Sequence, residues 1–155
     1  MDEIISQSLI LIIGTPYLFY FFTFDSRWLQ VILFSTITLF IHDIIKKQSI
    51  GSNLEFLKRP EGANNCDICS KNGDQSGKPG FPSGHVGSVV SFFTSVYLLF
   101  PEYQTGSLWV GILYTILMAW SRINKKCHTL LQTIAGTVLG FGVSVGLEFM
   151  KNLIK

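Results

Sequence analysis

The sequence predicts an all-α integral membrane protein, a bundle of five transmembrane helices with one long active-site loop. The first observation is composition: the 155 residues are 48% hydrophobic and only 14% charged, and the mean hydropathy is +0.39. The second is charge segregation, which leaves five charge-poor segments close to the roughly 20 residues that a helix needs to cross a bilayer. Backbone groups in lipid must be satisfied within their own segment, so helices are the structure to expect.

The five segments are taken in order as helices of one membrane domain over residues 1–155. They are expected over residues 4–24, 28–45, 85–100, 103–121 and 128–150. The start Met1-Asp2-Glu3 is acidic, whereas a signal peptide begins with basic residues, so the first segment is expected to remain as a helix. The third segment is the shortest of the five.

Residues 46–84 form the one stretch with a soluble character. They carry six of the twelve basic residues and three of the five prolines, and glycines interrupt them repeatedly. Little regular structure is expected there beyond a turn or two. A long irregular loop in a small protein is usually functional or disordered, and the plain alternative is a solvated linker.

Five spans place this loop, the short turn before residue 128 and the N-terminus on one face of the membrane. Arg59, His85, Arg122 and His128 therefore gather at that face. Guanidinium groups fork onto phosphate oxygens and stay charged. Imidazole serves as nucleophile or as acid and base near neutral pH. The four together indicate phosphate chemistry.

Ser83 and Gly84 stand where the loop meets the third helix. The free N–H groups and positive dipole end of a helix start favour a bound anion. Each residue alone has an ordinary interpretation: interfacial arginines often extend to lipid headgroups, and a serine here can be only an N-cap. The combination favours a binding site.

Three motifs carry a family resemblance. Arg59-Pro60, the PSGH of residues 82–85, and SRINKKCH at residues 121–128 resemble the three-part signature of the type 2 phosphatidic acid phosphatase superfamily, whose site is shared with vanadium-dependent haloperoxidases. The resemblance covers residues 46–140. Family members commonly have six spans, so this chain resembles a shortened version that lacks the first.

The resemblance implies a lipid phosphatase that needs no metal or other cofactor. His128 would attack phosphorus and form a phosphohistidine, and His85 would protonate the leaving oxygen and later activate water. Arg59, Arg122, Ser83 and the backbone N–H of Gly84 would hold the phosphoryl oxygens, as phosphoryl transfer demands.

Two positions depart from the family pattern. The lysine that normally precedes the arginine by seven residues is replaced by Ser52, and Lys58 or Lys47 is expected to supply its charge, with Lys58 as the candidate phosphate contact. Gln132 stands where the family has an aspartate. It lies on the same helix face as His128 and can accept its Nδ1–H bond, so aspartate is expected to be tolerated there.

The stretch HTLLQTIAG at residues 128–136 is similar to the dolichyl diphosphatase branch. It therefore favours a polyprenyl or other lipid diphosphate as substrate, because phosphate leaves more readily than an alcohol.

The three cysteines open alternatives. Cys66, Cys69 and Cys127 with His128 would make a structural zinc site. A disulfide within the loop and free thiols are the other interpretations. A further alternative, prompted by Ser52 and Gln132, is a lipid-binding membrane protein without catalytic activity.

The partners expected are a phosphorylated lipid and the bilayer, and no nucleic-acid motif is present. Glycines spaced by four in the last helix predict close packing within the bundle, with a homodimer as the second interpretation. The chain is expected to be a multi-pass protein of the endoplasmic reticulum or cell membrane. Lysines crowd the active-site face, which would make it cytosolic, whereas the family resemblance implies a lumenal or external site, and we favour the latter.

Overall fold

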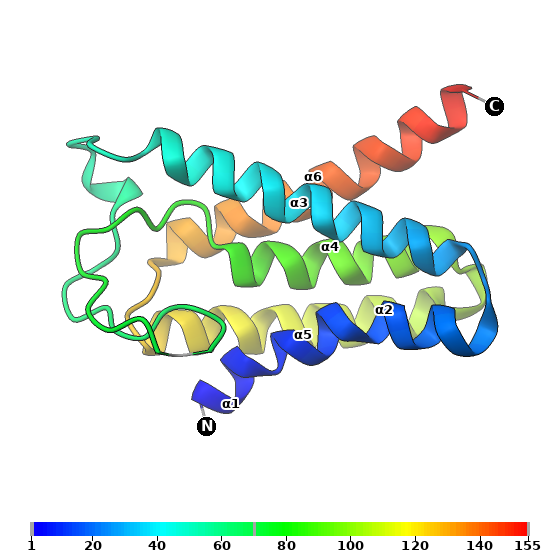
Figure 1. Ribbon diagram of the computed structural model, residues 1–155, viewed down its shortest axis with the longest axis horizontal. Coiled ribbons are helices and arrows are strands. Elements are labelled where there is room, and N and C mark those ends of the chain that lie inside the picture. Colours follow the sequence, from blue (N-terminus) through cyan, green and yellow to red (C-terminus); the bar gives the residue numbers. More distant parts are fainter. Residues whose placement is uncertain (1, 70, 155) are drawn as a thin grey trace.

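The computed structural model describes residues 2–69 and 71–154, and it confirms the all-α class (Figure 1). Long helices run back and forth, and two short 3₁₀ turns lie in the connections. The elements are α1 (Asp2–Gln7), α2 (Leu9–Thr23), α3 (Arg27–Gln48), η1 (Glu55–Leu57), α4 (Gly84–Leu99), η2 (Pro101–Tyr103), α5 (Gln104–Asn124) and α6 (Leu130–Ile154).

Four stretches are long and apolar enough to cross a membrane. They are Asp2–Thr23, Arg27–Gln48, Pro101–Asn124 and Leu130–Ile154. Large apolar side chains such as Phe22 and Ile154 point outward and are mostly exposed, as lipid-facing residues are. The first stretch bends at Ser8, whose hydroxyl donates to the Ile5 carbonyl at 2.6 Å, so it is divided into α1 and α2.

Helix α4 lies at the centre of the bundle and is shorter than its neighbours. Its 16 residues span about 24 Å, less than the thickness of the apolar part of a bilayer. Most of its residues are buried, because α3, α5 and α6 pack around it. Small polar residues line the contacts: Ser91 Oγ lies 2.9 Å from Thr38 Oγ1 and 2.9 Å from Ser144 Oγ. Close approach and hydroxyl contacts of this kind hold helices together in lipid.

Two of the four glycines in α6 account for its contact with α4. A Cβ at Gly136 would lie 2.5 Å from the carbonyl oxygen of Ser83, and one at Gly140 would collide with the carbonyl of Gly87. Gly142 and Gly146 face open space instead. The predicted close packing therefore holds for the half of α6 nearer the loop.

The bundle has two distinct ends (Figure 1). One end, here called the loop end, consists of residues 49–83 and 125–129 together with α1. The hydroxyl of Ser121 donates to the Asp2 carbonyl at 2.7 Å, which ties the N-terminus there. The C-terminus lies toward the other end. The long loop folds on itself through isolated bridges between Lys58 and Pro79 and between Asn64 and Asp74.

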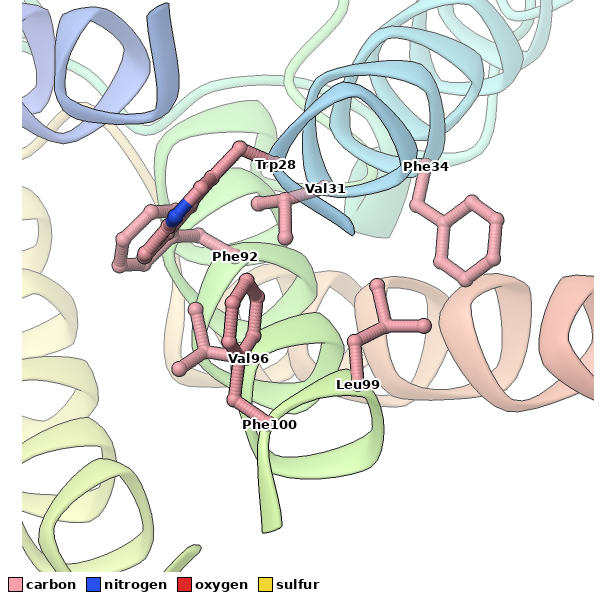
Figure 2. Packing of buried hydrophobic residues seen from close by; sticks show 7 residues of the cluster. All are labelled: Trp28, Val31, Phe34, Phe92, Val96, Leu99 and Phe100. Carbon is pink, nitrogen blue, oxygen red and sulfur yellow. The ribbon is translucent and has the colours of Figure 1, made fainter. Parts of the chain in front are cut away.

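An aromatic core fixes the end of the bundle away from the loop (Figure 2). The rings of Trp28 and Phe100 lie 4.4 Å apart between centroids, and side chains from α3 and α4 surround them. The Arg27 guanidinium covers Phe100 and pairs with Asp25 and Glu102. Its hydrogen bonds hold the pKa of the Asp25 carboxyl below its usual range. Ring packing and ion pairs thus join α3 to the end of α4 on the side away from the loop.

Candidate active site

The turn between α5 and α6 buries His128 at the loop end. The N–H groups of Cys127 and His128 both donate to the Arg122 carbonyl, at 2.9 and 3.2 Å, so the turn folds back on the last part of α5. His128 is only 2% exposed. Its Nδ1 lies 3.1 Å from Oε1 of Gln132. Since an amide oxygen can only accept, Nδ1 carries the proton and Nε2 keeps its lone pair.

Both ends of the Gln132 amide are used, which fixes its orientation. Oε1 also accepts from the N–H of Thr129 at 3.2 Å. Nε2 donates to two loop carbonyls, those of Phe56 at 3.0 Å and Lys58 at 2.7 Å. An aspartate has no donor for these carbonyls, so the structure argues against the expectation that aspartate would be tolerated here, which stays a prediction to test. The amide holds the imidazole and the loop together.

The two arginines enter the site from different elements and are partly anchored. Arg59, in the loop, donates from Nη1 to the Cys127 carbonyl at 2.9 Å. Arg122, at the end of α5 and 0% exposed, donates from Nη2 to the Cys66 carbonyl at 2.5 Å and from Nη1 to the hydroxyl of Ser6. In both residues Nε is buried without a hydrogen-bond partner among the described residues.

The PSGH segment supplies further unpartnered groups. Helix α4 begins at Gly84, and Ser83 precedes it in an extended conformation without capping the helix. The hydroxyl of Ser83 and Nε2 of His85 are both buried and find no partner within residues 2–69 and 71–154. The N–H of Ser83 donates to the Gln132 carbonyl at 2.9 Å, which holds this segment beside His128.

The unpartnered atoms indicate which kind of ligand would bind at this site. Buried polar groups nearly always have partners, so a cluster without them calls for an explanation. Arg59 Nε, Ser83 Oγ and Arg122 Nε can each donate a hydrogen bond. A compact anion with several oxygens, such as a phosphoryl group, would accept from all three while His85 faces one of its oxygens.

The electrostatics of the site agree with an anion. Burial first, and then the charges of Arg59, Arg122 and Lys46, hold the pKa of His128 well below its ordinary range. Burial also lowers the pKa of Arg59. His128 is thus a neutral imidazole surrounded by cations, a state suited to attack on phosphorus.

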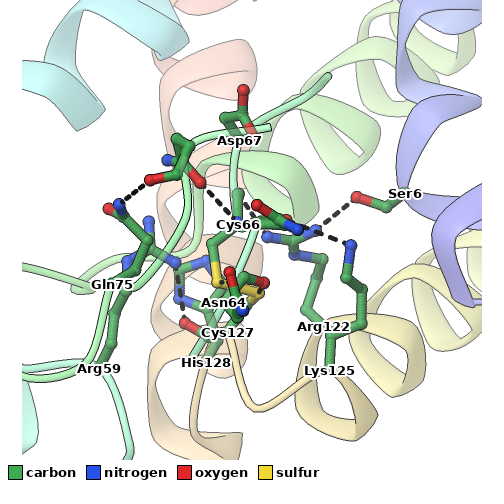
Figure 3. Close-up of a disulfide and its surroundings, with 12 residues drawn as sticks. Ser6, Arg59, Asn64, Cys66, Asp67, Gln75, Arg122, Lys125, Cys127 and His128 are labelled. Carbon is green, nitrogen blue, oxygen red and sulfur yellow. Dashed lines mark hydrogen bonds between the residues drawn. A yellow bond between two sulfur atoms is a disulfide. The ribbon is translucent and has the colours of Figure 1, made fainter. Parts of the chain in front are cut away.

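A disulfide between Cys66 and Cys127 crosses the site (Figure 3). It overturns the zinc interpretation, because two of the three thiols are joined, and it overturns a bridge within the C-x-x-C, because Cys69 is free and exposed. No metal-binding group of three His, Cys, Asp or Glu side chains occurs in the described part of the chain. The carbonyl of each bridged cysteine accepts from one arginine, so the covalent link sets the spacing of the two guanidinium groups.

Of the residues predicted from the sequence, Arg59, Ser83, Gly84, His85, Arg122, His128 and Gln132 lie together at the loop end. Lys58 does not join them through its charge: its ammonium pairs with Glu55 at 2.9 Å, and only its carbonyl contacts Gln132. Sequence reasoning missed Lys46, whose charge acts on His128. The helical repeat Thr38, His42, Lys46 was the available signal, because its first two members are buried on one face of α3.

Comparison with known proteins yields a family and a fold. The model of the PAP2 superfamily matches residues 27–150. The fold is similar to that of a transmembrane PAP2-type phosphatidylglycerolphosphate phosphatase from Bacillus subtilis, with a TM-score of 0.63 at 17% identity, over 99% of this chain and 86% of that one. No curated protein sequence matches the chain.

Proposed function

Because the chain belongs to the PAP2 superfamily, we propose that it hydrolyses a phosphorylated membrane lipid through a phosphohistidine on His128. The family and the membrane fold support phosphatase activity. The observation that carries the mechanism is the neutral His128 imidazole beside buried, unpartnered donors. Such preorganised donors stabilise charge on a phosphoryl group in transfer.

In the first step the Nε2 lone pair of His128 attacks phosphorus. The P–N bond forms as the bond from phosphorus to the leaving oxygen breaks. The bound anionic substrate favours the protonated form of His85, which gives its proton to that oxygen. Arg59, Arg122 and Ser83 donate hydrogen bonds to the phosphoryl oxygens and stabilise the negative charge that spreads over them. In the second step His85 takes a proton from water, the hydroxide attacks phosphorus, and the P–N bond breaks to release phosphate.

The substrate we favour is a polyprenyl or related lipid diphosphate. Gln132 orients His128 but carries no charge to stabilise an imidazolium. A phosphate leaving group makes the smaller demand on such a site. A groove of about 480 Å³ between α4, α5 and α6 supports a long hydrocarbon chain as part of the substrate. Its lining includes Val90, Phe93, Ile112, Ile116, Thr137 and Phe141.

We place the active site on the lumenal or external side of its membrane. Disulfides persist in oxidising compartments and are rare in the cytosol, and the Cys66–Cys127 bridge lies within the site itself. Cys69 is free and exposed at the same end. A membrane-impermeant thiol reagent applied to intact cells should therefore label Cys69. If the protein lies in an internal membrane, sealed vesicles of known orientation replace the cells, and labelling of Cys69 from the cytosolic side contradicts this placement.

Phosphate release by the purified full-length chain in lipid nanodiscs tests the proposed activity. Polyprenyl diphosphate and phosphatidic acid are compared, each with a chelator present. We expect release from both, faster from the diphosphate, and none from His128→Ala. Binding of the lipid without release would instead identify a lipid-binding protein. Activity that the chelator abolishes and a divalent cation restores would refute this mechanism.

A further inference from the structure

Helix α3 presents a polar stripe to α4. Thr38 and His42 are almost completely buried on this face, and Lys46 follows at the same spacing of four residues, which keeps it on that face. A Cβ added to Gly87 would collide with the ring of His42, so α3 and α4 lie in close contact at this level. The next residue of the stripe toward the loop end is Lys46.

The ammonium group of Lys46 lies at the first residue of α4. A Cβ added to Gly84 would lie 3.3 Å from Nζ of Lys46. No hydrogen bond or ion pair joins this ammonium to any residue in the ranges 2–69 and 71–154. Its charge nevertheless acts on His128, where it adds to those of Arg59 and Arg122. A third cation thus stands at the start of a helix, where the charge of Asp43, in the preceding turn of α3, acts on it without a hydrogen bond or an ion pair between the two among the described residues.

The other candidates for this cation are placed elsewhere. Ser52, which occupies the position of the family's lysine, accepts from the N–H of Leu54 in the turn after α3. Lys58 pairs with Glu55, and Lys47 is exposed. Of Lys46, Lys47 and Lys58, it is Lys46 that lies against the PSGH segment, at Gly84. The charge of Lys125 also acts on His85, but its ammonium donates to the Asn65 carbonyl at 3.2 Å.

We propose that Lys46 binds the phosphoryl group of the substrate, so that α3 supplies the third cation of the site in place of the loop. This inference rests on the proposed function for its ligand, a phosphoryl group. The ammonium has three donors and no hydrogen-bond partner within the described ranges, and it lies beside Gly84, the first residue of α4, where helix N–H groups are free. An arriving phosphoryl oxygen would satisfy both and would relieve the repulsion among the three cations.

Orthovanadate is the probe for this role, because its five-coordinate form imitates phosphoryl transfer. Its binding to the full-length chain in nanodiscs is measured by calorimetry for the parent, Lys46→Met, Lys46→Arg and Lys47→Ala. Loss of one charge-assisted hydrogen bond should weaken binding about 10- to 100-fold in Lys46→Met. Lys46→Arg should recover part of it, and the exposed control Lys47→Ala should match the parent.

A second readout is the apparent pKa of His128, followed by NMR of labelled histidine. Removal of the Lys46 charge should move this pKa upward, toward its ordinary range, in Lys46→Met but not in Lys47→Ala. If Lys46 had only a structural role, a Lys46→Met variant that melts at the parental temperature would keep both the vanadate affinity and the His128 pKa of the parent.

The outcomes separate this role from the enzymatic activity. Vanadate binding that depends on Lys46 in a chain that releases no phosphate would retain the anion site and reject the proposed function. Equal vanadate affinity in the parent and a folded Lys46→Met variant would overturn the role of Lys46, as would a parent that binds no vanadate at all. If Lys46→Met does not fold, Lys46→Gln takes its place. A folded Lys46→Gln variant with the vanadate affinity and the His128 pKa of Lys47→Ala would also overturn the role of Lys46.

Discussion

Oε1 of Gln132 accepts a hydrogen bond from Nδ1 of His128, one helical turn earlier, at 3.1 Å. The same amide donates from Nε2 to the loop carbonyls of Phe56 and Lys58. The side chain therefore couples the orientation of the nucleophile to the position of the loop that carries Arg59. A carboxylate could perform the first task but not the second.

Replacement of Gln132 by glutamate tests this double role. The new oxygen would face two carbonyl oxygens, which leaves both without a donor and adds repulsion. Each buried group without a partner costs about 1–3 kcal/mol, so we expect a lower melting temperature and slower phosphate release in Gln132→Glu and in Gln132→Asp. Gln104→Glu, at an exposed position, is the matched control. Parental stability and activity in Gln132→Asp would show that the two loop carbonyls do not need the amide.

The pH dependence of the first chemical step follows from the lowered pKa of His128. Burial and the neighbouring cations keep its imidazole neutral below the ordinary value of 6.5. Phosphoenzyme formation from a diphosphate should therefore persist below that pH, and Arg59→Gln should shift its acidic limb to higher pH because one cation is gone. Rapid-quench rates at a series of pH values measure the acidic limb in the parent and in Arg59→Gln. An unshifted acidic limb in Arg59→Gln would show that the charge of Arg59 does not lower the pKa of His128.

Stability should respond to the same group in a defined direction. The pKa of His128 is lower in the folded chain than in the unfolded chain, so unfolding takes up a proton. The contribution of this residue is fully present above pH 6.5 and is lost as the pH falls below it. Relative to His128→Gln, the parent should lose melting temperature more steeply on acidification.

Reduction of the Cys66–Cys127 bridge should disturb both arginines together. The two bridged residues offer their carbonyls to Arg122 and Arg59, and a native disulfide typically contributes on the order of 2–5 kcal/mol to a small domain. We expect a lower melting temperature and a raised KM in Cys66→Ala with Cys127→Ala. Cys69→Ser should match the parent, since that thiol is free. A reductant that changes neither quantity would contradict this structural role.

Packing of α6 against α4 gives a comparison within one helix. Gly136→Ala and Gly140→Ala would force a methyl group against the carbonyls of Ser83 and Gly87, whereas Gly142→Ala adds one in open space. The first two should destabilise the bundle by roughly 1–3 kcal/mol, and the third should be neutral or slightly stabilising. Thermal unfolding in one detergent ranks the three. Equal melting temperatures for all three variants would contradict the close contact of α6 with α4 at Gly136 and Gly140.

The motifs and the fold were open to prediction because they depend on local patterns. Charge-poor segments of fixed length define the spans, and PSGH with Ser121-Arg122 and His128 places the site chemistry at helix ends. The partner of Cys66 was not open to prediction, because 61 residues separate it from Cys127 and no periodicity links a loop to a distant turn.

Lys46 and the second role of Gln132 mark two different limits. Lys46 continues the buried stripe of Thr38 and His42, so helical spacing alone would have found it. The donors of Gln132 contact backbone carbonyls of an irregular loop, and the position of such carbonyls depends on tertiary packing. The motif alone therefore does not reveal that a glutamine at this position has loop contacts that an aspartate would lack.

The central claim is that His128 carries the phosphoryl group, and trapping of the phosphoenzyme tests it most directly. The full-length chain is mixed with a lipid diphosphate labelled at the terminal phosphorus, quenched within milliseconds and analysed by peptide mapping. We expect an acid-labile, alkali-stable label on His128 and no label in His128→Ala. A label on another residue, or parental phosphate release by His128→Ala, would contradict it.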